Sequence, residues 1–529
     1  MTGSPIPFDQ TTTSASSAIP LAITTLLTII LTIAFVHKSK KNAAKYSSIP
    51  QIPGALPIIG NKLHDLERLV VQMEEWAAKH STHNNATGLL RMNLFGTHYV
   101  LVSDDASASR LEAGRPYDVT KPPQFEDVMR SLHAGGVFAV EGEQWRKDRR
   151  IVGPSLSRKN VRDYMSSVKI VCRRLMDTLG TLRERGPVAI NDLLLAVTFD
   201  VIALVACDAD VDSLRRGESE MGKHLKTLIQ SFNFRLLSPF SYWKIPLIGN
   251  YLDGGGFAAD QLLEMYRNLI RRNEGLEEEE KPKNFLTRVL AMNKSEDPVY
   301  VMDEARLIGN IMTLFLGGTE TTQVTLCSSL WEIAVDETGL QDELAREALA
   351  LENFEEAELD DIMNGLPRLR SLIYEVLRIR GPTPFMVLRS MKDMEIAGVT
   401  VPSQTQFFVL WRFISTLDDV SDPERLTPLG PEHSPRKQFC PRRWLTTKED
   451  GTLSVHTPSH KHGWRPFGVG MRVCPGRDFA EVEMLIILAS ILRKYEISLK
   501  EGHAPMTLVS RFTECPDIEI CLVLKDRIE

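Results

Sequence analysis

The chain has 529 residues with 62 basic and 69 acidic side chains, which give it a formal net charge of -7. Hydrophobic residues make up 43% and charged residues 25% of it, as in a globular protein with a sizeable core. This composition excludes a disordered or fibrous chain, and the acidic balance gives no overall bias toward nucleic acid.

The first element in chain order is an uncharged apolar segment over residues 18–36. Its length is close to the roughly 20 residues that a helix needs to span a bilayer, so we expect a transmembrane anchor. No Lys or Arg precedes the segment, whereas Lys38 and Lys40 follow it directly. This charge asymmetry predicts a short lumenal tail over 1–17 and a cytosolic main body. A cleaved signal peptide, the alternative, would require basic residues before the apolar run.

The next segment, residues 37–60, is basic at first and then rich in Pro and Gly. Such a stretch disfavours both helix and central strand, so it predicts a stiff hinge after the anchor. Residues 61–529 contain no internal repeat and no long low-complexity linker. We therefore expect a single catalytic domain over 61–529.

Helical periodicity covers most of this domain, over residues 158–185, 303–336, 340–351, 369–380 and 475–494. Strand-like alternation is confined to short stretches. One is a hairpin over 89–102 with Gly96 and Thr97 at its turn, and another small sheet is expected over 394–401 and 406–411. The fold class indicated is mainly α with small β-sheets.

Two pairs of side chains stand at helical spacing. Trp145 and Arg149 are four residues apart, and Glu375 and Arg378 are three apart, so each pair shares one helix face. Alone, either pair is typical of an ordinary surface helix.

A third feature interrupts the helical pattern over 303–336 with Gly317, Gly318, Thr319, Glu320 and Thr321. Adjacent glycines inside a helix cost roughly 1 kcal/mol each relative to alanine, so a packing or functional reason is expected. Hydroxyl groups there bond back to carbonyls and let the helix open into a groove. An acid beside an alcohol also suits proton delivery. A kinked core helix is the structural alternative.

Seven cysteines, an odd number without a C-x-x-C pair, indicate neither a disulfide framework nor a structural zinc site. Cys474 alone lies in a glycine-rich loop directly before a predicted helix. A helix N-terminus favours an anion, so this position predicts a lowered thiol pKa. A thiolate there would serve as a nucleophile or as a ligand for a soft or redox-active metal.

This loop, F-x-x-G-x-R-x-C-x-G, resembles the haem-binding signature of the cytochrome P450 family, with Phe467, Gly470, Arg472, Cys474 and Gly476 in place. The resemblance implies the cytochrome P450 fold behind a single transmembrane helix, and haem b with Cys474 as the axial iron ligand. Gly470 would let the backbone approach the macrocycle, and Arg472 would pair with a haem propionate.

The same resemblance implies roles for the features found earlier. Thr321 would stabilise iron-bound dioxygen, and Glu320 would lead protons inward. Trp145, Arg149 and Arg389 would contact the haem propionates.

Glu375 and Arg378 would form a buried structural cluster with Arg443. The sequence departs from the family at Arg442, where an acid is common.

The function implied is a haem-dependent monooxygenase that hydroxylates or epoxidises a lipophilic small molecule. No dinucleotide or flavin motif appears. The resemblance implies that NADPH acts only through a membrane-bound flavoprotein reductase, with cytochrome b5 as a second candidate partner. The expected location is the endoplasmic reticulum membrane, facing the cytosol. A reductase-docking patch near Cys474 is expected at five basic residues: Arg436, Lys437, Arg442, Arg443 and Lys461.

Substrate identity is not specified by these motifs. A terpenoid, polyketide or alkaloid intermediate of secondary metabolism is the first hypothesis, and fatty-acid, sterol or xenobiotic oxidation is the alternative. A reductase-independent isomerase or dehydratase and a non-catalytic haem sensor are the rival functions; the pair Glu320 and Thr321 argues against both. Apolar candidates for the pocket lining are Phe125, Met129, Val137, Phe138, Phe315, Phe385 and Met386.

Overall fold

The computed structural model describes residues 44–527 except 57–58, 81–87, 95, 239, 278, 280, 298–299, 417–437 and 459–462. The predicted tail and anchor, and the start of the hinge, lie outside the described residues. Within the described part of the chain, no helix has the length and hydropathy of a membrane span. The expectation of a mainly helical fold with small sheets is confirmed.

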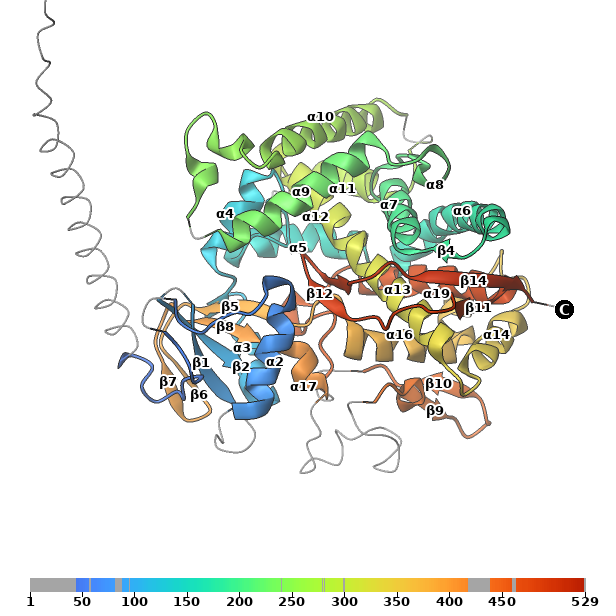
Figure 1. Ribbon diagram of the computed structural model, residues 1–529. Helices are drawn as coiled ribbons and strands as arrows, with labels where there is room; N and C mark the ends of the chain where they lie inside the picture. Colours follow the sequence, from blue (N-terminus) through green and yellow to red (C-terminus); the bar gives the residue numbers. More distant parts are fainter. Residues whose placement is uncertain are drawn as a thin grey trace, which may run out of the picture.

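A five-stranded sheet lies at one side of the molecule, next to a larger helical body (Figure 1). The predicted hairpin over 89–102 is present, with Leu89 opposite Val102. β2 then pairs in parallel with β8, which pairs antiparallel with β5, and β5 pairs with β3. The strands in sheet order are β1 (Leu89–Leu94), β2 (Thr97–Val102), β8 (Gln406–Val409), β5 (Met386–Ser390) and β3 (Val119–Thr120).

Alternating side chains divide this sheet between two small cores, because successive residues of a strand point to opposite faces. Leu101 packs with α2 (Leu69–His80) on one face, and Val100 packs with α3 (Asp105–Ala113) on the other. Both faces of the sheet are thus covered, and α3 is held where its side chains meet the cysteine loop.

The helical body is built around α13 and α19, which are buried on nearly all sides (Figure 1). Its other main helices are α5 (Gly142–Ser155), α6 (Arg158–Leu182), α7 (Asn191–Cys207), α9 (Glu220–Leu237), α10 (Gly255–Glu274), α11 (Phe285–Asn293), α12 (Glu304–Gly318), α14 (Leu340–Ala350), α15 (Leu359–Gly365) and α16 (Pro367–Arg380). The two buried helices span Glu320–Val335 and Arg477–Lys494. Shorter helices are α4 (Pro123–Ser131), α8 (Ser213–Arg216) and α17 (Trp411–Thr416).

One sequence prediction about the strands was wrong. Residues 394–401 form a separate hairpin, whereas 406–409 enter the five-stranded sheet between β2 and β5, and Trp411 begins α17. The sequence did not reveal this because the pairing of β8 with β2 joins segments some three hundred residues apart. The remaining strands are β4 (Val188–Ala189), β6 (Met394–Ile396), β7 (Val399–Val401), β9 (Leu445–Thr447), β10 (Leu453–Val455), β11 (Tyr495–Leu499), β12 (Leu508–Ser510), β13 (Glu514–Pro516) and β14 (Cys521–Asp526).

The loop between α4 and α5 contacts α12 through two glycines. A Cβ atom on Gly136 would lie 2.3 Å from the Gly309 carbonyl oxygen, and one on Gly309 would lie 2.9 Å from the Gly136 nitrogen. Nearby, the Val137 N–H donates to Asn310 Oδ1 at 2.8 Å. The backbone of this loop is therefore fixed against α12.

Candidate functional site

Cys474 lies in a tight loop directly before α19. Its N–H donates to the Phe467 carbonyl at 2.8 Å, and this bond closes the loop. Gly468 and Gly470 have φ angles of 69° and 65°, in the left-handed region that side chains disfavour. A Cβ atom on Gly476 would lie 3.9 Å from the Cys474 sulfur. The glycines of the sequence pattern therefore give this loop its shape and bring the backbone close to the sulfur.

The expectation of a lowered thiol pKa at Cys474 was wrong for the protein alone. Burial raises the pKa of Cys474, although the Gly476 N–H and the charges of Arg149 and Arg477 act in the opposite direction. The helix N-terminus does not outweigh the loss of solvation. Coordination to a metal ion removes the proton from a thiol, so this result is compatible with a metal-bound thiolate.

The start of the cysteine loop is anchored to α3 by Arg465, whose side chain is fully buried. Its Nε donates to both oxygens of Glu112 at 3.1 Å, and the Trp411 indole N–H donates to the same carboxylate at 2.9 Å. Asp105 adds an ion pair at 2.5 Å. The sequence pattern did not indicate this anchor, because Glu112 lies more than three hundred residues before Arg465.

A cluster of charges, here called the basic pocket, lies between the cysteine loop and the start of α5. Arg115, Lys121 and Arg472 surround the carboxylate of Glu141, the residue preceding α5. The Lys121 ammonium is 2.8 Å from Glu141, and Arg115 is 3.7 Å away. Arg472 also donates to the Val140 carbonyl at 2.7 Å. When all three cations are protonated, they exceed the one carboxylate by two charges.

The charge balance of the basic pocket suits a ligand with two carboxylates. Burial and the neighbouring Arg472 lower the pKa of Lys121 to about 7, although Glu141 acts in the opposite direction. An added anion would raise this pKa again, so binding would bring charge compensation. The propionates expected from the sequence have this chemistry. Arg115, Lys121 and Glu141 were missed by the sequence analysis because no local motif marks them.

Trp145 and Arg149 both face this region from α5. The Arg472 guanidinium lies 4.6 Å from the centre of the Trp145 ring, and Arg149 is close enough to Cys474 for its charge to affect the thiol pKa. Burial lowers the pKa of Arg149. The structure thus brings the predicted residues of α5 and the cysteine loop together.

The position of Arg389 in the structure is defined by the pairing of its strand. It lies in β5 opposite Thr120 of β3, the residue before Lys121. This register puts it beside the strand that leads into the basic pocket. Its predicted propionate contact stays a prediction.

On another side of the site, the long predicted helix over 303–336 is interrupted at Thr319. The Thr319 hydroxyl donates to the Phe315 carbonyl at 2.7 Å, and the Thr321 hydroxyl donates to the Gly317 carbonyl at 2.6 Å. Gly318 packs against α7, and a Cβ atom there would lie 2.8 Å from Ile202 Cδ1, so the isoleucine side chain would have to shift. Gly317 is exposed, and a Cβ atom there would meet nothing within 4 Å. Gly318 therefore packs against α7, whereas no other atom of the described residues lies close to Gly317 on the opposite side of the helix.

Glu320 begins α13 with its carboxylate largely buried. Oε2 accepts a hydrogen bond from the Thr513 hydroxyl at 3.2 Å. Burial raises the pKa of Glu320, while Thr513 and the charge of Arg511 act in the opposite direction. A raised pKa makes this carboxyl group easier to protonate, as a group that passes protons requires.

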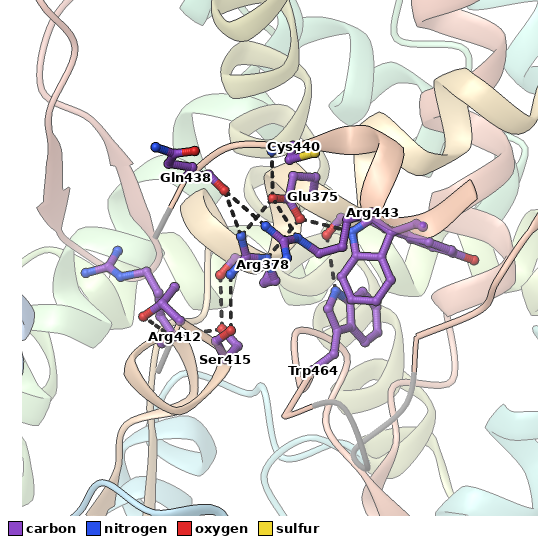
Figure 2. Close-up of polar contacts among 11 residues, drawn as sticks. Glu375, Arg378, Arg412, Ser415, Gln438, Cys440, Arg443 and Trp464 are labelled. Carbon is purple, nitrogen blue, oxygen red and sulfur yellow. Dashed lines mark hydrogen bonds and ion pairs between the residues drawn. The ribbon is translucent and has the colours of Figure 1, made fainter. Parts of the chain in front are cut away.

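Glu375, Arg378 and Arg443 form one buried cluster beside Gln438 and Cys440 (Figure 2). Arg378 donates to the two Glu375 oxygens at 2.7 and 2.9 Å, and Arg443 donates at 3.4 Å. The Cys440 N–H at 2.9 Å and the Trp444 indole N–H at 3.0 Å complete the carboxylate's contacts. Burial raises the pKa of Glu375, but Arg378 and Arg443 outweigh it, so that the pKa is lowered. The predicted cluster geometry is present.

The predicted docking patch was wrong at Arg443, because this side chain is buried in the cluster with Glu375. Its neighbour Arg442 is exposed and forms an ion pair at 2.6 Å with Glu343 of α14. Arg436, Lys437 and Lys461 lie outside the described residues.

Among the predicted lining residues, Met129 and Phe315 are fully buried in the main core, and their place in a pocket stays a prediction. Phe385 and Met386 pack against the two cores of the sheet, and Val137 is buried. Phe125 and Phe138 instead belong to a row of four rings, here called the aromatic row, which also contains residues that the sequence analysis missed. Neighbouring centroids are 5.2, 5.6 and 5.2 Å apart along Phe138, Phe125, Phe232 and Phe512.

Comparisons with known proteins agree with this arrangement. The family model described as Cytochrome P450 matches residues 50–512. Cytochrome P450 736A117 of Prunus mume is 26% identical over 510 residues, which cover 92% of each chain. Indolin-2-one monooxygenase of Zea mays is 24% identical over 483 residues, covering 88% of this chain and 86% of its own.

The fold is also found among solved structures. The crystal structure of the cytochrome P450DA heme domain superposes with a TM-score of 0.73 at 20% sequence identity, covering 91% of this chain and 98% of that one. This likeness concerns the fold alone.

Proposed function

The chain belongs to the cytochrome P450 family and is a monooxygenase, and from this premise we propose that it hydroxylates or epoxidises a lipophilic intermediate of secondary metabolism. The observation that carries the substrate class is the aromatic row, whose rings come from α4, the following loop, α9 and the turn between β12 and β13. Four rings in edge contact favour a rigid, apolar ligand over an extended chain. The maize relative is named for a compact ring substrate, which fits this reading.

The family implies haem, and the residues of this chain fit it. Cys474 would bind the iron, and the basic pocket with Arg149 and Trp145 would hold the propionates. Bound haem supplies the activation of dioxygen for transfer of one oxygen atom. Thr321 and Glu320 would hold and pass the protons that this reaction consumes. The presence of this acid–alcohol pair favours oxygen insertion over a rearrangement without a reductase.

The proposed location is the endoplasmic reticulum membrane, with the catalytic domain in the cytosol. The apolar segment over 18–36 supports it, as do large apolar side chains exposed between the ends of α9 and α10. An exposed apolar surface of this kind suits contact with lipid. The residues concerned are Phe234, Leu237, Phe240, Leu247, Ile248 and Leu252.

A product screen tests substrate class and location together. The full chain is expressed with a flavoprotein reductase, and microsomal pellet and supernatant are each incubated with NADPH and panels of terpenoids, polyketides, alkaloids, fatty acids and sterols. We expect oxygenated products from a ring-containing compound, and activity in the pellet. Turnover of fatty acids alone would contradict the substrate class, and activity in the supernatant would contradict the location.

Family members generally receive electrons from a partner reductase, and we place its docking surface on α5. Trp145 and Arg149 face the site, whereas Arg146, Lys147 and Arg150 of the same helix are exposed. A basic surface so close to Cys474 suits an acidic partner.

Reversing the charge of Arg146, Lys147 and Arg150 together to Glu is expected to slow electron transfer from the reductase by on the order of tenfold at low salt, because electrostatic steering is lost. Stopped-flow reduction of the haem measures this rate. Lys226→Glu on α9, an exposed lysine away from the cysteine loop, is the control and is expected to leave the rate unchanged. An unchanged rate in the triple variant would exclude α5 as the docking surface.

A further inference from the structure

The carboxylate of Glu320 contacts a segment that is far from its own helix in the sequence. Thr513, its hydrogen-bond donor, lies in the turn between β12 and β13, and its side chain is buried. Arg511 of the same turn adds a positive charge near the carboxylate. This turn, residues 511–513, is here called the hairpin tip.

The hairpin tip is fixed from its other side by a buried ion-pair cluster. Glu514, the residue after Thr513, pairs with Arg412 of α17, which also donates to both oxygens of Glu74 on α2 at 2.9 Å. The Glu514 N–H donates to the Pro382 carbonyl at 2.9 Å. Arg412 appears beside the Glu375 cluster in Figure 2. The hairpin tip is thus tied to the half of the molecule that carries the five-stranded sheet.

The same hairpin tip takes part in the proposed substrate surface. The ring of Phe512, one residue before Thr513, lies 5.2 Å from that of Phe232 on α9, with an angle of 85° between the ring planes. Phe512 is therefore the end of the aromatic row. A substrate that contacts this ring contacts the backbone segment that holds Glu320.

We propose that Thr513 is a positioning residue, whose hydroxyl holds the Glu320 carboxylate in one orientation, and that Phe512 links substrate contact to this orientation. The inference rests on the proposed role of Glu320 in proton delivery. It assigns to the C-terminal hairpin a part in the reaction that the helix motif alone does not reveal. A hydrogen bond to a carboxylate restrains its rotamer and favours its charged form.

The pKa of Glu320 depends on its burial and on the groups that face its carboxylate. Burial raises its pKa, and the opposing influences come from Thr513 and Arg511. Cys515 of β13 also interacts with Glu320, but burial raises the pKa of this thiol to about 11, so it stays neutral near pH 7. Loss of the Thr513 hydroxyl should therefore raise the pKa of Glu320 further.

The decisive variant is Thr513→Val, with Thr513→Ser as the variant that keeps the hydroxyl. The infrared carboxyl band of Glu320, assigned by its loss in Glu320→Gln, is titrated against pH in each protein, with no turnover required. We expect its pKa to rise by about one pH unit in the valine variant and to return toward the original value in the serine variant. No rise with valine, or the same rise with serine, would overturn the proposal.

Thr507→Val is the matched control, because this threonine bonds to Asp517 beside the same hairpin, away from Glu320. It is expected to leave the Glu320 titration unchanged. In the haem-loaded enzyme with reductase, Thr513→Val should also divert NADPH electrons from product to hydrogen peroxide. A shifted titration with unchanged peroxide yield would support the Thr513 contact and contradict the proposed role of Glu320 in proton delivery.

Discussion

Replacement of Cys474 with serine is expected to abolish monooxygenase turnover and the spectral signature of a thiolate-ligated haem. The reason is the axial ligand: a thiolate directs electron density onto the iron, and a hydroxyl does not. The loop itself should survive, because its bonds are made by the backbone N–H of Cys474 and the glycines around it. Reduced carbon monoxide difference spectra and product formation with reductase are the measurements.

Cys521→Ser is the control for this prediction. Cys521 is an unpaired, partly exposed cysteine in β14, and its replacement should leave both spectrum and turnover intact. A thiolate-type spectrum that persisted in Cys474→Ser would show that another residue binds the iron.

The second large effect is expected at Arg443. Its replacement with glutamine removes one partner of the buried Glu375 cluster and should lower the free energy of unfolding by roughly 3 to 5 kcal/mol. The neighbouring Arg442→Gln is the matched control: this side chain is 65% exposed and pairs only at the surface, so a change of about 0 to 1 kcal/mol is expected. Chemical denaturation followed by circular dichroism measures both. Equal losses in the two variants would contradict the structural role of the cluster.

The same cluster has a defined pH dependence. Because the pKa of Glu375 is lowered in the folded protein, its contribution to the free energy of unfolding is complete above the pKa of an unfolded glutamate. This contribution is lost as the pH falls through the folded value. The difference in the free energy of unfolding between the wild type and Arg443→Gln should therefore become smaller at low pH.

Local patterns were sufficient for the parts of the site that lie close in sequence. The glycines beside Cys474 predicted the loop, and the glycine pair with Thr319 predicted the interruption of the long helix. Glu375 and Arg378 were predictable for the same reason, since helical spacing fixes their contact.

Contacts between distant segments were not predictable. Glu141 appears in the sequence as an ordinary acid before a helix, and nothing near it marks Arg472 as its partner. Thr513 and Glu320 are 193 residues apart and share no motif. The burial of Arg443 beside Glu375 was expected only from the resemblance to the family, because no local pattern marks it, and this burial excludes Arg443 from the docking patch. Burial likewise reversed the expected pKa direction of Cys474.

The backbone contact between Gly136 and Gly309 has a consequence for engineering this enzyme toward other compounds. A side chain at Gly136 would collide with the carbonyl of Gly309, so a mutagenesis library should leave this position constant. Two residues further on, Phe138 is 38% exposed and open to exchange. Selection for new substrates would therefore change side chains of the loop between α4 and α5, while the contact with α12 keeps the backbone of this loop in place.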